Sequence, residues 1–192
     1  MNIAVRHGFH FLGDMDAKPK DKFAPLRLFS LQSPGTMENV LKHDSPPLWV
    51  FDYEYHIHRD QDVGQTVALF EMSKTEWPPL VIESRKRERF TVAAMRLLTQ
   101  KIAHWQLSYK EVDMAFNPEF SKHYRVFCGK EGEDVKSLVA EPSLDFFCGN
   151  PGWNVEALNQ WLLIYRHGTY VKPKEMETFF SSVSAIYELM KC

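Results

Sequence analysis

The 192-residue chain has few cysteines, and none of them has the spacing that binds zinc or cycles a disulfide. The three cysteines are Cys128, Cys148 and Cys192, and no two of them form a C-x-x-C pair. An odd number of thiols at unrelated spacings fits reduced cysteines better than a disulfide framework. We therefore expect a cytoplasmic protein.

Long apolar runs are also absent from the sequence. No stretch approaches the roughly 18 apolar residues of a membrane-spanning helix. Residues 1–16 lack an apolar core of signal-peptide length and include acidic residues early. The sequence therefore predicts no membrane-spanning segment.

Neither sign of charge dominates the composition. The 23 Lys and Arg residues oppose 25 Asp and Glu residues, which gives a formal net charge of −2. Such a balance creates no global field for a polyanion and argues against dedicated nucleic-acid binding. The G-x-S-x-G, H-E-x-x-H and G-x-x-x-x-G-K-[ST] patterns are missing as well. No reaction is indicated by motif, and we expect no cofactor.

The composition is that of a globular protein, with 44% hydrophobic and 25% charged residues. We expect one domain over residues 1–192. Its first half is rich in strand patterns, of which Leu48 to His58 is the clearest because apolar and polar residues alternate there. Further strands are predicted at Leu26 to Leu31, Gln65 to Met72, Leu80 to Ile82 as a short edge strand, Tyr109 to Phe116, and Tyr124 to Cys128.

The last third combines a hairpin with helices. Trp153 to Leu158 and Trp161 to Arg166 form the predicted hairpin, and its second strand is apolar on both faces, as a central strand is. Apolar residues at three- and four-residue steps predict helices over Arg85 to Gln106 and Met176 to Met190. We therefore predict an α+β fold, a mainly antiparallel sheet with flanking helices and a C-terminal amphipathic helix.

Several short motifs occur in a characteristic order along the chain. They are Phe51-Asp52-Tyr53-Glu54-Tyr55, Gln65-Thr66-Val67, Trp77-Pro78-Pro79-Leu80, Pro118-Glu119-Phe120-Ser121, Tyr124-Arg125-Val126, Pro151-Gly152-Trp153-Asn154-Val155-Glu156 and Leu162 to Arg166. Together they resemble an uncharacterised family of bacterial proteins, in which a similar domain often follows membrane-spanning helices. The resemblance implies one domain, and it implies no activity, ligand or catalytic residue.

Aromatic residues make up 14% of the chain, which is more than the periodic core positions require. Some of Trp49, Trp77, Trp105 and Trp153 could line an interface, where an indole supplies both apolar area and a hydrogen-bond donor. The alternative is that they fill the core. If they form an interface, we expect at least two of them to share one exposed apolar patch.

One dense basic run, Arg85-Lys86-Arg87-Glu88-Arg89, follows the predicted edge strand. Its arginines, Arg85, Arg87 and Arg89, create a local positive field that could contact phosphate or form the rim of an interface. The alternative is the solvated start of a helix.

Two histidines alternate along the clearest strand. The two-residue period places His56, His58 and Asp60 on one face, and two imidazoles with a carboxylate are a suitable set for zinc or iron. A solvated strand face has the same alternation, and a metal needs further ligands from elsewhere.

The sequence thus leaves two functions open. The first is a non-enzymatic binding domain that recognises a protein or small ligand through an aromatic surface, and the second is a metal-dependent enzyme centred on His56 and His58.

Overall fold

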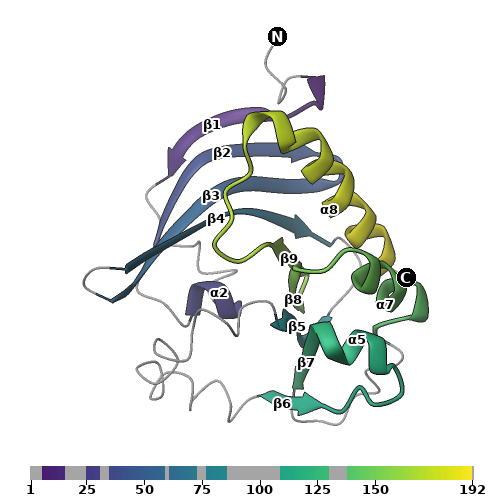
Figure 1. Cartoon of the computed structure of the whole chain (residues 1–192). Coiled ribbons are helices and arrows are strands. Elements are labelled where there is room, and N and C mark those ends of the chain that lie inside the picture. Colours follow the sequence, from purple (N-terminus) through teal and green to yellow (C-terminus); the bar gives the residue numbers. More distant parts are fainter. Residues whose placement is uncertain are drawn as a thin grey trace.

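The structure, a computed structural model, describes residues 6–15, 25–30, 35–58, 61–72, 77–85, 109–129 and 138–191, without the side chains of residues 57, 58 and 61. The strands are β1 (His10–Met15), β2 (Thr36–Asp44), β3 (Pro47–His58), β4 (Gln61–Glu71), β5 (Trp77–Ser84), β6 (Tyr109–Val112), β7 (Tyr124–Gly129), β8 (Asn154–Asn159) and β9 (Trp161–Tyr165). The helices are α2 (Arg27–Ser30), α5 (Pro118–His123), α7 (Glu141–Gly149) and α8 (Met176–Met190), which follows a 3-10 turn at Pro173–Glu175. This architecture confirms the predicted α+β fold (Figure 1).

All nine strands described belong to one antiparallel sheet, in the order β1-β2-β3-β4-β9-β8-β5-β7-β6. The hairpin of β3 and β4 is its longest pair. The alternation read from the sequence is confirmed there, because Tyr53 and Tyr55 are buried while His56 is exposed.

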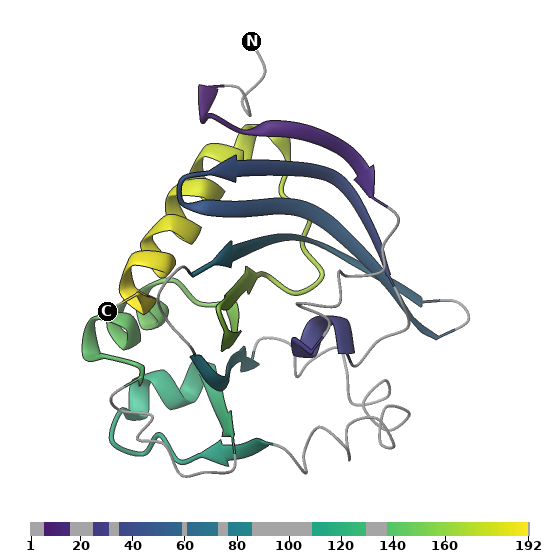
Figure 2. The ribbon, with the colours of Figure 1, turned by 180° about the vertical axis from the view of Figure 1, so that it is seen from behind.

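Each face of the sheet has its own apolar core. On one face, residues such as Val50, Phe70 and Ile164 pack under α8 and α7 (Figure 1). On the other face, Phe51, Tyr53 and Leu163 pack with the apolar residues of α2, which is seen from behind in Figure 2. The two-layer burial explains why β9 is apolar on both faces, as predicted.

The C-terminal helix has the bounds that the sequence predicts. Its buried residues are Phe179, Phe180, Val183, Ile186 and Met190, which recur at three- and four-residue steps. Phe180 stacks on Phe9 with ring centroids 4.7 Å apart. The helix therefore docks by a continuous stripe across the sheet.

Among the residues described, no helix is long and apolar enough to cross a membrane.

Two strand predictions are wrong in detail. Leu26 to Leu31 was expected to be a strand, but residues 27–30 form α2, because one helical turn buries Leu28 and Phe29 together. Leu80 to Ile82 was expected at an edge, but β5 lies between β8 and β7. The register shift between Trp77 and Leu80 accommodates the two prolines inside the sheet, where a proline cannot donate to the ladder.

Other expectations are met in part. The β8–β9 hairpin is confirmed, with Asn159 at φ 51° in its tight turn. The expected strand Tyr109 to Phe116 ends at Val112. The helix expected over Arg85 to Gln106 lies outside the described residues except for Arg85.

Gly64 on β4 provides space for the ring of Tyr170. A Cβ atom at Gly64 would overlap the Tyr170 hydroxyl, which donates to Glu54 Oε2 at 2.8 Å. Burial and the Glu54 carboxylate raise the pKa of Tyr170.

We expect Gly64→Ala to displace the ring, cost about 1 kcal/mol of unfolding free energy through the lost hydrogen bond, and lower the Tyr170 pKa toward its ordinary value. Urea melts and tyrosine titration by NMR measure both effects. Gly149→Ala, whose Cβ would meet nothing within 4 Å, is the control, and an unchanged Tyr170 pKa in Gly64→Ala would contradict the assignment.

Candidate functional site

The tryptophans do not form the expected surface together. Trp77 and Trp153 are 5% and 2% exposed and belong to the core beneath α8. Trp49 is half-buried, and its ring packs edge to face against that of Trp161 with the ring centroids 5.9 Å apart. Trp105 lies outside the described residues. The expectation of an exposed patch is therefore corrected for Trp77 and Trp153. Their indoles fill the space between sheet and helix, where Trp153 contacts Phe179.

The exposed apolar side chains lie elsewhere. The large exposed hydrophobic residues in the described part of the chain are Phe11 at 62%, Leu12 at 49%, Phe116 at 46% and Tyr170 at 46%. Only Phe11 and Leu12 are neighbours in sequence, and both belong to β1 at one edge of the sheet. Tyr170 is held by its hydrogen bond to Glu54. The edge strand β1 is therefore the main apolar feature of the described surface.

The backbone of β1 is irregular. Its pairing with β2 shifts register between Phe11 and Gly13 and again between Gly13 and Met15. Gly13 has a φ of +80°, which favours glycine. Sequence reasoning missed this strand because its residues, HFLGDM, do not alternate. The apolar pair Phe11-Leu12 followed by Gly13, a residue that often marks a bulge within a strand, is the sequence signal that could have indicated it.

Arg85 is part of the protein's internal structure. Its Nε donates to the backbone oxygens of Ser121 and Tyr124 at 2.9 and 3.2 Å, so it fastens the end of β5 to the junction of α5 and β7. Arg87 and Arg89 lie outside the described residues. A contact of these two arginines with phosphate, or a place at the rim of an interface, therefore stays a prediction.

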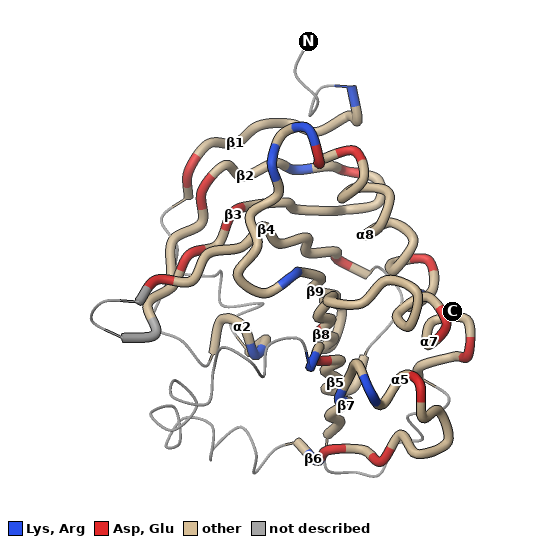
Figure 3. The backbone as a smooth tube through the Cα atoms, in the orientation of Figure 1, with Lys and Arg blue, Asp and Glu red and all other residues tan. Residues whose placement is uncertain are grey.

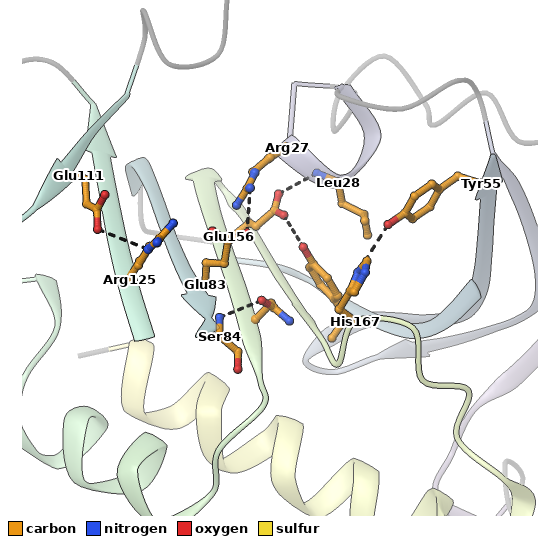
Figure 4. A network of polar contacts seen from close by, with 11 residues as sticks. Arg27, Leu28, Tyr55, Glu83, Ser84, Glu111, Arg125, Glu156 and His167 are labelled. Atoms are coloured by element: carbon orange, nitrogen blue, oxygen red, sulfur yellow. Dashed lines mark hydrogen bonds and ion pairs between the residues drawn. The ribbon is translucent and has the colours of Figure 1, made fainter. Parts of the chain in front are cut away.

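A cavity of about 410 Å³ lies beside Arg85. It is lined by Arg85, Glu111, Val112, Asp113, Met114, Ser121, Tyr124 and Arg125. Arg125 Nε lies 3.6 Å from Glu111 Oε1 (Figure 4). Burial raises the pKa of Tyr124 to about 12, so its hydroxyl stays neutral at physiological pH. Two arginines and two carboxylates balance one another in the lining, and the cavity therefore carries no clear preference for an anion.

The proposed metal ligands are only partly described. His56 is exposed and its Nδ1 contacts the Asp62 carboxylate. Other acidic residues lie on β2 and on β3, the strand of His56 (Figure 3). One of them, Asp52, already accepts hydrogen bonds from Thr66 Oγ1 at 2.6 Å and from Asn39. In the described part of the chain no group of three His, Cys, Asp or Glu side chains could hold a metal ion. The side chain of His58 and all of Asp60 lie outside it, so metal binding remains a prediction that metal analysis of untagged protein can test.

A buried polar network fastens α2 to the sheet. Glu156 of β8 accepts from the Leu28 N–H at 3.0 Å and from the Tyr165 hydroxyl at 2.8 Å (Figure 4). Arg27 forms an ion pair with Glu83 at 2.9 Å beside it. Burial raises the pKa of Glu156. Sequence reasoning did not select Glu156 as a site, although a single carboxylate within the buried strand NVEALN indicates one. Its hydrogen bonds all serve the fold.

Comparison with known proteins gives a likeness of fold. No protein-family model matches the chain, and no curated protein matches its sequence. A similar solved structure is the mycobacterial trehalose monomycolate transport factor A, with a TM-score of 0.65 and 10% sequence identity over 98% of this chain and 90% of that one. At this identity, the likeness shows that the two proteins share a fold.

Proposed function

We propose that this protein is a non-enzymatic binding domain that contacts a partner protein through Phe11 and Leu12 of β1. The observation that carries the proposal is the exposure of these two neighbouring apolar side chains at a sheet edge. Binding energy at protein interfaces concentrates in a few anchors that become fully desolvated. Phe11 has the largest exposed fraction of the large hydrophobic residues described, so it is the expected anchor.

Side chains, rather than an added strand, carry the proposed contact. An added strand needs a regular row of free N–H and C=O groups. The two register shifts within the six residues of β1 interrupt that row, and bulges are a known device against edge pairing. The expected partner therefore offers an apolar pocket for Phe11, the more exposed of the two side chains.

The comparison structure gives limited support. Its name describes a transport factor and no reaction. We also propose that the protein belongs to the uncharacterised bacterial family that it resembles. Its cysteines further support a cytoplasmic location.

The test uses a photo-crosslinking amino acid at position 12, with the same residue at position 116 as the control site. The captured protein is then purified, and its affinity is measured by calorimetry. We expect Phe11→Ser to weaken binding about 30-fold, as loss of an anchor worth about 2 kcal/mol does, and Phe116→Ser to leave it unchanged. Equal crosslinking at both positions, or an affinity insensitive to Phe11→Ser, would refute the proposal.

A further inference from the structure

A second cavity lies on the α8 side of the sheet, away from β1. It has a volume of about 210 Å³ and is lined by Trp153, Arg166, Thr169, Val171, Glu175, Thr178, Phe179 and Ser182. These residues come from the approach to β8, the segment after β9, and the first turns of α8. Trp153, Val171 and Phe179 are the apolar residues of the lining, and the other five are polar or charged.

Arg166 brings a positive charge to this cavity. Its guanidinium carbon lies 4.3 Å from the centroid of the Trp153 ring, a cation–π contact that leaves its N–H groups available. Arg166 is exposed and forms no ion pair within the described part of the chain. Glu175 also lines the cavity, but its Oε2 accepts from the Lys172 N–H at 3.4 Å.

Two further residues of the lining carry hydrogen-bond donors. Trp153 Nε1 is buried without a hydrogen bond in the part of the chain that the structure describes, which is costly for a buried donor. Thr178, in the first turn of α8, is exposed, and its hydroxyl supplies the other donor. Arg166, Thr178 and the Trp153 indole therefore bring donors to one small cavity, and that of Trp153 is buried without a partner among the described residues.

The walls are held in place before any ligand binds. Gly168 N donates to Gln65 Oε1 at 3.1 Å, Thr66 N donates to Thr169 O at 3.0 Å, and Val171 N donates to Thr66 Oγ1 at 2.9 Å. These bonds fasten the segment after β9 to β4. A preformed site binds with less loss of conformational entropy.

We propose that this cavity binds a small ligand that joins an oxyanion, a carboxylate or a phosphate, to an apolar group. The oxyanion accepts from Arg166 and Thr178, and the apolar group lies against Trp153, Val171 and Phe179. Glu175 limits affinity for anions because its carboxylate repels them. The proposal is independent of the protein contact at Phe11.

The probes are benzoate and phenyl phosphate, with benzamide as the neutral analogue. Binding is followed on ¹⁵N-labelled protein through the indole N–H signal of Trp153, which is assigned as the signal lost in Trp153→Phe. We expect a saturable shift with at least one anion and none with benzamide. A shift with only one of the two anions assigns the oxyanion as carboxylate or phosphate.

Three variants separate the proposal from nonspecific binding. Arg166→Gln should weaken the anion about tenfold or more, since a charge-assisted hydrogen bond is lost, and Glu175→Gln should strengthen it. Lys174→Gln removes an exposed cation nearby that does not line the cavity, and it should change nothing. Circular dichroism confirms that each variant is folded. The absence of a saturable shift with both anions, an equal shift with benzamide, or an affinity unchanged by Arg166→Gln would overturn the proposal.

Discussion

Replacing Phe180 with alanine is expected to lower the free energy of unfolding by about 3 kcal/mol or more. Phe180 is 6% exposed, stacks on Phe9 and packs beside Phe179 in the core under α8. Truncation removes the buried ring and leaves a cavity that the sheet and helix can fill only in part. Urea melts followed by circular dichroism give the loss directly.

The neighbouring residue supplies the matched control. Ser181 lies one position further along α8 and is exposed. Ser181→Ala should change stability by less than about 0.5 kcal/mol, as surface substitutions do. A loss of that small size in Phe180→Ala would mean that the helix does not dock through this side chain.

The sequence predicts those parts of the fold in which periodicity is strong. Alternation in β3 and the three- and four-residue steps of α8 each identify a buried face, and both are confirmed. Where periodicity is weak, prediction failed. A short apolar run such as Leu26 to Leu31 fits a strand and a helical turn equally well. The turn is favoured by a long-range contact, the hydrogen bond from the Leu28 N–H to Glu156.

The position of β5 in the sheet could not be derived from local pattern. Pro78 and Pro79 indicate an edge strand, since proline cannot donate to the ladder. The irregular register with β8 resolves the conflict, but it depends on a strand some seventy residues later in the chain. Strand order is set by such long-range pairing.

The candidate sites show the same limit. Tryptophan suits both cores and interfaces, and its type alone gave no reason to separate buried Trp77 and Trp153 from an exposed surface. Phe11 and Leu12 are exposed because β1 is at an edge, which the sequence does not state. The cavity at Arg166 combines residues from the approach to β8, the segment after β9 and the first turns of α8, so only the folded chain brings them together.

Removing the buried carboxyl of Glu156 should have an effect at least as large as that of Phe180→Ala. Glu156→Ala leaves the Leu28 N–H and the Tyr165 hydroxyl without their acceptor inside the protein, and each such group costs about 1 to 3 kcal/mol. We therefore expect a loss of about 3 kcal/mol or more of unfolding free energy, measured by urea melts. Glu141→Gln, at an exposed position of α7, is the control and should be nearly neutral. A loss under about 1 kcal/mol in Glu156→Ala would show that α2 is not fastened through this side chain.

The isosteric variant Glu156→Gln removes the charge and one of the two acceptor oxygens, so the charge is isolated by the pH dependence of stability and not by its absolute value. Because burial raises the Glu156 pKa in the folded protein above its ordinary value of 4.5, the carboxyl stabilises the fold most when it is protonated, below that ordinary value. This contribution is lost as the pH rises through the folded-state pKa. Glutamine stays neutral at every pH, so the stability of Glu156→Gln relative to the unsubstituted protein should improve from about pH 4.5 to about pH 8. Urea melts across that range test the sign, with Glu141→Gln as the reference that carries no buried carboxyl. A stability difference that does not change with pH would mean that Arg27 beside Glu156 offsets the cost of burial and keeps the carboxylate ionised.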